Sequence, residues 1–139
     1  MVQRTINGGQ YWRYHETDTG YNLFAVSFAA DRKGWGAGQH GIVLRTADGG
    51  FVWKAISSGT NKDLHGILAL SDQEIYVVGA DGLILHSMDG GEIWKQQHTD
   101  LDTDLYKIVR AEDGKMLWVV GEWGVILKRR IELPEIGLR

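Results

Sequence analysis

The chain has 139 residues, of which 43% are hydrophobic and 24% are charged, and this composition indicates a globular chain that can bury a sizeable core. Its formal net charge of −3 argues against nonspecific nucleic-acid binding, because phosphates need a basic surface. Cysteine is absent, which excludes disulfides, thiolate metal ligands and cysteine nucleophiles.

The N-terminal sequence MVQRTINGGQ lacks the apolar stretch of a secretory signal. No apolar run in the sequence approaches the roughly 18 residues that a membrane-spanning helix needs. We therefore expect no membrane insertion, and we expect the protein to lie in the cytoplasm or in a particle assembled there. Nothing in the residue pattern calls for a metal or a cofactor, and we expect neither.

A turn motif is the first element in the chain. Residues 5–12 fit the pattern Ser/Thr-x-Asp/Asn-x-Gly-x-x-Trp, and residues 46–53 and 87–94 repeat it. The tryptophans that end the three copies are therefore separated by two steps of 41 residues. Several leucine, isoleucine and glycine positions keep this step, with one extra residue shortly before Trp118. The chain is an internal repeat, and a period of about 40 residues is typical of a propeller blade.

The strands expected in each repeat are short, rich in β-branched and aromatic residues, and bounded by Gly, Asp, Asn and Ser. Residues 1–15 hold the first turn motif and an orphan outer strand that ends a repeat without its beginning. The first full blade covers residues 23–56, with strands at 23–28, 33–38, 42–46 and 51–56. The second covers residues 64–97, with strands at 64–70, 74–79, 83–87 and 92–97. The third, residues 105–129, has strands at 105–110, 116–121 and 125–129 and lacks its outer strand. Residues 130–139 form a tail.

The turn motif has a structural explanation at every position. Its glycines take positive φ without steric cost, the hydroxyl and the Asp or Asn side chain bond neighbouring backbone amides, and the tryptophan packs over the turn or between blades. We assign this structural role to Thr5, Asn7, Gly9, Trp12, Thr46, Asp48, Gly50, Trp53, Ser87, Asp89, Gly91 and Trp94. A metal or ligand site at Asp48 and Asp89 is the functional alternative.

The run GWGAGQHGIVLRTADGGFVW, residues 34–53, resembles the repeats of the photosystem II stability/assembly factor family. That family lies within the broader group of Asp-box, or BNR-type, propellers, which includes sialidases, xyloglucan-cleaving glycosidases and the sortilin ectodomain. The resemblance covers roughly residues 5–129 and implies an all-β propeller. It also implies an extracytoplasmic scaffold that binds a membrane-protein subunit during complex assembly. The chain departs from the family in its number of blades, about three instead of seven, and in showing no leader or lipid anchor.

An arc of three blades leaves sheet edges open, and open edges pair readily with another chain. The two ends are complementary in type, because one holds an outer strand and the other lacks one. We therefore expect the N-terminal strand of one subunit to complete the third blade of another. A homodimer would then form a six-bladed ring, with a nine-bladed trimer or closure within one chain as alternatives.

The turns between the second and third strands vary in sequence inside a constant pair of glycines. This variation indicates a surface whose side chains the fold does not need, and we expect it to bind a partner or ligand. The candidate residues are Gln39, His40, Asp81, Glu122 and Trp123. An exposed Trp123 would anchor a protein partner or stack on a sugar. The structural alternatives are packing of Trp123 against a neighbouring blade or subunit, and a solvated His40.

The function expected from these patterns is a non-catalytic binding and scaffold module that acts in assembly of a larger complex. A structural subunit of a virion or a secretion-type assembly is one alternative, and a lectin-like propeller is another. A glycosidase would need two suitably spaced carboxylates, for which Asp81 and Glu122 are the candidates. A sialidase would also need an arginine cluster, and none accompanies them.

Overall fold

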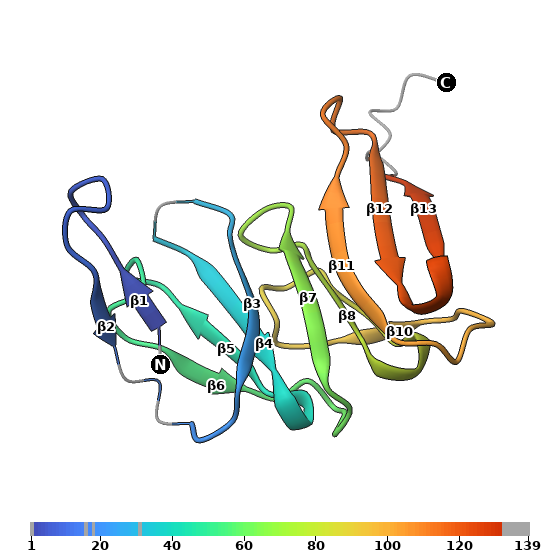
Figure 1. Cartoon of the computed structure of the whole chain (residues 1–139), viewed down its shortest axis with the longest axis horizontal. Helices are drawn as coiled ribbons and strands as arrows, with labels where there is room; N and C mark the ends of the chain where they lie inside the picture. Colours follow the sequence, from blue (N-terminus) through green and yellow to red (C-terminus); the bar gives the residue numbers. More distant parts are fainter. Residues whose placement is uncertain (1, 16, 18, 31, 132–139) are drawn as a thin grey trace.

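The computed structural model describes residues 2–15, 17, 19–30 and 32–131, and over these residues the chain consists of strands and turns (Figure 1). The strands are β1 (Val2–Arg4), β2 (Arg13–His15), β3 (Leu23–Phe28), β4 (Gly34–Gly38), β5 (Val43–Thr46), β6 (Lys54–Ile56), β7 (Leu64–Ala69), β8 (Ile75–Gly79), β9 (Ile84–Ser87), β10 (Lys95–Gln97), β11 (Leu105–Arg110), β12 (Met116–Gly121) and β13 (Ile126–Arg130). Residues 132–139 of the predicted tail lie outside the described part of the chain.

The strands form four antiparallel sheets, each built from strands that follow one another in sequence. Blade 1 has the order β3-β4-β5-β6, blade 2 has β7-β8-β9-β10, and blade 3 has β11-β12-β13. β1 and β2 form a separate two-stranded hairpin. The first strands of the blades, β3, β7 and β11, pack side by side, so the blades fan outward from one axis (Figure 1). The predicted all-β propeller class is confirmed, whereas closure of a ring by oligomerisation stays a prediction.

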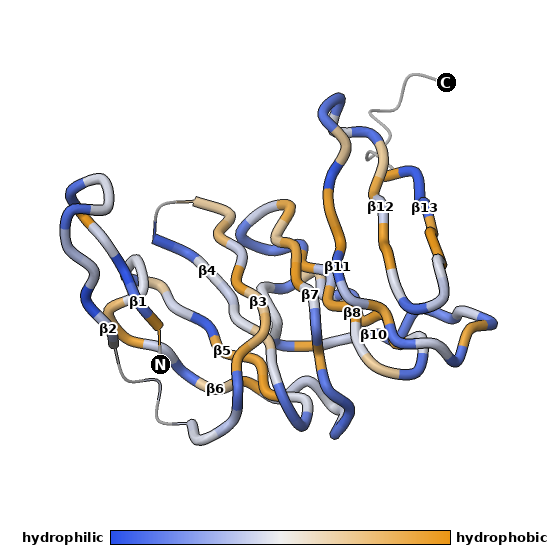
Figure 2. Tube along the Cα trace, in the orientation of Figure 1, coloured by the Kyte–Doolittle hydropathy of each residue, from blue (hydrophilic) through white to orange (hydrophobic). Residues whose placement is uncertain are grey.

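The hydrophobic core lies between neighbouring blades. One cluster joins blades 1 and 2 around Trp35, Ile67 and Val77, and a second joins blades 2 and 3 around Tyr76 and Leu105. Apolar segments follow the strands, and hydrophilic segments lie mostly in the loops (Figure 2). β4 and β8, each the second strand of a four-stranded blade, are buried along their whole length. β13, at the end of the row, is mostly exposed.

The N-terminal region has one more strand than the sequence predicted. β1 pairs with β2, with Val2 opposite His15, Gln3 opposite Tyr14 and Arg4 opposite Arg13. β1 lies one repeat before β5, and Val2-Gln3-Arg4-Thr5 parallels residues 43–46, VLRT. The predicted orphan outer strand is therefore a hairpin that supplies the third and fourth strands of a blade.

Candidate binding face

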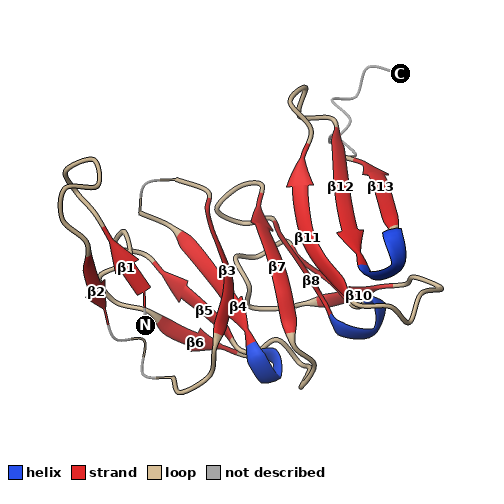
Figure 3. Cartoon of the chain, viewed as in Figure 1, coloured by secondary structure: helices blue, strands red, loops and turns tan. Residues whose placement is uncertain are grey.

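Three short turns place the candidate residues at one edge of the blades, where each turn joins a second strand to a third (Figure 3). They are the 3-10 turns η1 (Gln39–Gly41), η2 (Ala80–Gly82) and η3 (Glu122–Gly124). The middle residues, His40, Asp81 and Trp123, have φ of 55°, 58° and 60°. A left-handed backbone is unfavourable for residues with a Cβ, and most of all for a bulky one. Each turn is closed by its own backbone hydrogen bond, such as that from the Ile42 N–H to the Gln39 carbonyl at 3.0 Å, and contacts from outside the turn add support in blades 1 and 2.

The next blade supplies those contacts. The backbone N–H of His40 donates to Asp63 Oδ1 at 2.9 Å, and that of Asp81 donates to Asp104 Oδ1 at 3.0 Å. Asp63 and Asp104 each stand just before the first strand of the following blade. The turn of one blade is thus tied to the entry of the next. Among the described residues, the N–H of Trp123 has no such partner, because no blade follows η3 there.

Two of the candidate side chains have a structural role, contrary to our expectation that the fold does not need them. Gln39 Oε1 accepts the backbone N–H of Asn22 at 2.8 Å, and Glu122 Oε1 accepts that of Asp104 at 2.9 Å. Both bonds fix the loop that enters the same blade. This role could not be inferred from the repeats, because the equivalent residue of blade 2 is Ala80, whose side chain makes no hydrogen bond.

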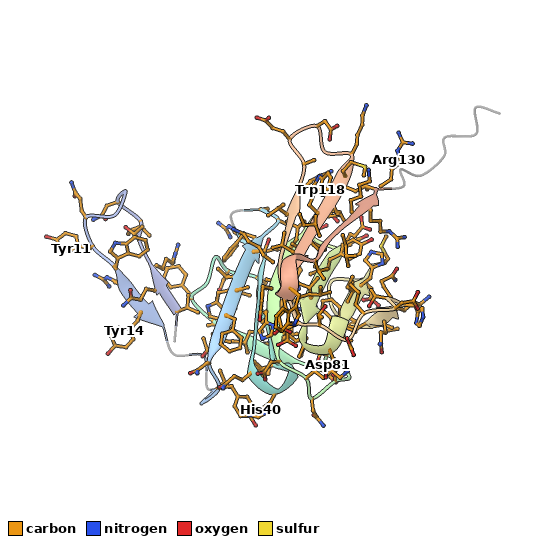
Figure 4. The ribbon with its side chains drawn as sticks, turned by 45° about the vertical axis from the view of Figure 1, so that its right-hand side comes forward. Tyr11, Tyr14, His40, Asp81, Trp118 and Arg130 are labelled. Carbon is orange, nitrogen blue, oxygen red and sulfur yellow. The ribbon has the colours of Figure 1, made fainter. Side chains whose placement is uncertain are left out.

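The other three candidate side chains differ in their surroundings. The His40 ring lies 4.8 Å from the ring of Tyr21 between centroids. The carboxylate of Asp81 lies 3.6 Å from Lys62 Nζ in an exposed ion pair. His40 and Asp81 both lie at the lower edge of the blades in Figure 4. The Trp123 side chain is 87% exposed, more than any other large hydrophobic residue described.

A row of rings crosses the inner strands beside these turns. The His65 ring lies 5.6 Å from that of Phe24 and 5.4 Å from that of Tyr106, between centroids. Burial raises the pKa of the Tyr106 hydroxyl, and the charges of Glu122 and Asp104 raise it further. The hydroxyl therefore stays neutral at physiological pH and available as a hydrogen-bond donor. These three residues occupy the same position in the three repeats, and this spacing is the sequence pattern that indicates the row.

The Asp-box turns lie at the opposite end of the blades and are closed by their own residues. In the second copy, the Thr46 hydroxyl donates to Asp48 Oδ1 at 2.8 Å and accepts the Gly50 N–H at 3.0 Å, while Asp48 Oδ1 accepts the Val52 N–H at 3.0 Å. Ser87, Asp89, Gly91 and Ile93 make the same bonds in the third copy, and Thr5, Asn7, Gly9 and Tyr11 make them in the first.

The carboxylates of the Asp-boxes are therefore engaged with their own turns. The Val52 N–H lowers the pKa of Asp48, and the Ile93 N–H lowers the pKa of Asp89, with further help from the hydroxyls of Thr46 and Ser87. In the part of the chain that the structure describes, no group of His, Asp and Glu is arranged to hold a metal ion. No helix among the described residues has the length and apolar character to cross a bilayer.

The tryptophans that end the Asp-boxes differ in burial. Trp53 is 6% exposed, and its Nε1–H donates to the Gly50 carbonyl at 2.9 Å. Trp94 packs against the cluster between blades 1 and 2. Trp12 is 59% exposed, although its Asp-box has the same hydrogen bonds as the other two. Formation of the turn therefore does not depend on burial of its tryptophan.

Known proteins resemble this chain in sequence and in fold. The family model described as photosynthesis system II assembly factor YCF48 matches residues 60–130, which is just over half of the chain. No curated protein matches it significantly. Among solved structures, YCF48 from Cyanidioschyzon merolae is 20% identical with a TM-score of 0.79, covering 92% of this chain and 44% of its own.

Two further structures share the fold. YCF48 bound to D1 peptide is 22% identical with a TM-score of 0.70, covering 81% of this chain and 37% of its own. An ancestral GH74 enzyme is 17% identical with a TM-score of 0.68, covering 93% of this chain and 21% of its own. The chain thus spans less than half the length of each of these three structures. At these identities the structural likeness establishes the propeller fold, and function needs a separate argument.

Proposed function

The chain belongs to the family of the photosynthesis system II assembly factor YCF48, and from this premise we propose that it is a non-catalytic propeller module that binds a protein partner during assembly of a larger complex. The observation that carries this proposal is Trp123, a tryptophan that is 87% exposed and held in a left-handed turn. A large exposed ring on a short turn loses little conformational entropy on binding, and tryptophan is the residue most enriched among interface anchors.

We propose that the binding surface consists of His40, Asp81 and Trp123, with Tyr106 beside it. Gln39 and Glu122 support this surface, because their side chains hold the loops behind it. Asp81 gives the surface an acidic member and the neutral Tyr106 hydroxyl gives it a hydrogen-bond donor. Since one solved YCF48 structure is described as bound to a D1 peptide, a peptide segment of a protein partner is the ligand class that we propose.

A non-enzymatic role fits the geometry of the two candidate carboxylates. Asp81 is paired with Lys62, and Glu122 accepts the Asp104 N–H. A glycosidase needs one carboxyl group free to protonate the leaving group and a second free to act as base or nucleophile. Both groups already have a partner within the chain, Asp81 in an exposed ion pair and Glu122 in a hydrogen bond, and this supports a non-enzymatic role.

Titration of a labelled D1 peptide by fluorescence anisotropy tests the proposal. Replacing Trp123 with Asn, a residue that accepts a left-handed backbone, should weaken binding by about 30-fold, as expected for loss of an interface anchor. The matched control is Ile93→Ala, because Ile93 is 65% exposed but lies in an Asp-box turn at the opposite end of blade 2. Equal affinities for Trp123→Asn and the unchanged protein would contradict the proposed surface.

Self-association belongs to the same proposal. Each copy supplies three blades, so two copies would give a six-bladed ring. Two observations support it: no described strand covers the outer edge of β13, and Trp12 is exposed at the other end of the row.

A further inference from the structure

The two ends of the row of blades expose surfaces that are buried against each other wherever two blades meet inside the chain. Between blades 1 and 2, Trp35, Ala37 and Val43 are 1%, 0% and 0% exposed. The residues at the same repeat positions in blade 3 are Trp118, Val120 and Ile126, which are 37%, 42% and 64% exposed. We call these three residues the C-terminal face. It has the composition of an interior surface, yet no described blade covers it.

The opposite end of the row also exposes a surface that is buried elsewhere in the chain. Val26 of blade 1 is 56% exposed, whereas Ile67 and Ile108, at the same position in blades 2 and 3, are 6% and 5% exposed. A groove of about 330 Å³ separates the hairpin from blade 1, with Val2 on one wall and Val26, Leu44 and Trp53 on the other. We call this groove and Val26 the N-terminal face. Inside the chain, the corresponding surface of blade 2 packs against blade 1, and that of blade 3 packs against blade 2.

A cavity of about 500 Å³ lies between blades 2 and 3. Tyr76, Ile84 and Leu127 line it. One repeat earlier, the equivalent residues Trp35, Val43 and Leu85 belong to the cluster against which Trp94 packs. The cavity therefore has the position of an Asp-box tryptophan, and the described part of blade 3 has no fourth strand to bring one.

The hairpin of β1 and β2, at the other end of the row, carries an Asp-box, its tryptophan and a fourth strand, which the described part of blade 3 lacks. It holds a fully bonded Asp-box, and its Trp12 is exposed. Figure 4 shows Tyr11 and Tyr14 of the hairpin pointing away from the blades. β1 pairs with β2 at only three positions, and a two-stranded sheet is marginally stable in water. β13 pairs with β12 at five positions, and no described strand pairs with its outer edge.

We propose that a second copy of the chain docks at blade 3, with its β2 as the fourth strand and its Trp12 in the cavity between blades 2 and 3. Its N-terminal face then covers the C-terminal face of the first copy. This deepens the proposed self-association. β13 and β1 are both third strands and compete for one edge of β2. β13 displaces β1, because β13 is anchored in a three-stranded sheet and β1 is not.

The internal junction between blades 1 and 2 specifies the contacts of this interface. In blade 1, Arg45 stands opposite Lys54, so Lys128 of β13 should stand opposite Arg13 of the second copy's β2. Trp35 Nε1–H donates to the Gly90 carbonyl of blade 2 at 2.9 Å. Trp118 should donate in the same way to the equivalent carbonyl, that of Gly49, in the second copy. The interface is head-to-tail, so two copies form two identical junctions when the ring closes.

Multi-angle light scattering on the full chain, over a range of concentrations, tests the interface. We expect a closed oligomer with a mass that is a multiple of 15.6 kDa, two copies being the expected number. Trp12→Ala and Trp118→Glu should each weaken association by about 30-fold, as expected for loss of a buried aromatic anchor. Both side chains are exposed in the single chain, so circular dichroism should show an unchanged fold. Ile93→Ala is the control and should leave the oligomer intact, because Ile93 is exposed in the Asp-box turn of blade 2 and belongs to neither face.

A cysteine pair gives a second readout, since the natural chain has none. The double variant Arg13→Cys with Lys128→Cys should form disulfide-linked copies on oxidation, and Arg13→Cys with Trp123→Cys should not. A monomer at all concentrations would overturn the proposal, as would an oligomer unaffected by Trp12→Ala and Trp118→Glu. If the chain's own residues 132–139 occupy the cavity, removing them would strengthen association and Trp12→Ala would have no effect on the full chain. Peptide binding by the Trp118→Glu variant distinguishes failure of this interface from failure of the proposed function.

Discussion

The junction between blades 1 and 2 and the junction between blades 2 and 3 are built from the same repeat positions, yet only the first is filled. In the first junction, Trp94 of an Asp-box packs against the cluster that contains Trp35, Val43 and Leu85. Tyr76, Ile84 and Leu127 line a cavity of about 500 Å³ in the second. The difference shows that a blade is not a self-sufficient unit, because the tryptophan that packs into the first junction comes from the Asp-box just before the outer strand of the next blade.

The most direct test of this comparison removes a large buried side chain from the junction between blades 1 and 2. Trp35→Ala removes a ring that is 1% exposed and leaves a cavity, so the free energy of unfolding should fall by about 3–5 kcal/mol. Trp118→Ala, at the same repeat position in blade 3, removes a ring that is 37% exposed and should cost less than about 1 kcal/mol in the monomer. Urea unfolding at low protein concentration measures both values.

Equal costs for the two substitutions would mean that the end of the row is as well packed as its middle. A larger cost of Trp118→Ala that appears only at high protein concentration would instead report the contact between copies. The concentration series therefore separates packing within the chain from association.

The first three strands of blades 1 and 2 could be placed from the sequence to within one residue, because three copies of one motif mark the same turn. The fourth strands, β6 and β10, begin three residues later than predicted, because residues 51–53 and 92–94 belong to the Asp-box turns. β1 was missed because three residues, Val2–Arg4, are too short to show a strand period. The supporting roles of Gln39 and Glu122 could not be predicted, because their partners lie 17 and 18 residues away in loops with no pattern of their own. The glycine frame did locate the turns, but it did not predict the left-handed backbone of His40, Asp81 and Trp123.

The hydrogen bonds between each turn and the following blade allow a second comparison, between the loops that enter blades 1 and 2. Asp63→Ala removes the acceptor for the His40 N–H, and stability should fall by about 1 kcal/mol because the left-handed turn loses its support. Asn22 occupies the same position before blade 1, where no described turn precedes it, so Asn22→Ala should change stability by less than about 0.5 kcal/mol. Thermal unfolding of both variants checks the difference, and equal effects would show that Asp63 acts through its own loop.

The smallest expected effect concerns the Asp-boxes, two of which carry Asp while the first carries Asn7 in the same hydrogen-bonded geometry. The pKa values of Asp48 and Asp89 are lowered in the folded chain. A lowered folded pKa means that ionisation stabilises the fold above the unfolded pKa, near 3.8, and that this stabilisation is lost as pH falls through the folded pKa.

We therefore expect the melting temperature to fall when the pH is lowered from 5 towards 2, and to fall less in the double variant Asp48→Asn with Asp89→Asn. Both carboxylates are exposed to solvent, so the difference should amount to a small shift and not to a loss of folding. The double variant should still fold at neutral pH, because Asn7 closes the first turn with the same bonds. An unchanged acid dependence in the double variant would assign the acid sensitivity to other carboxylates, and would make Asp and Asn equivalent in this turn at every pH.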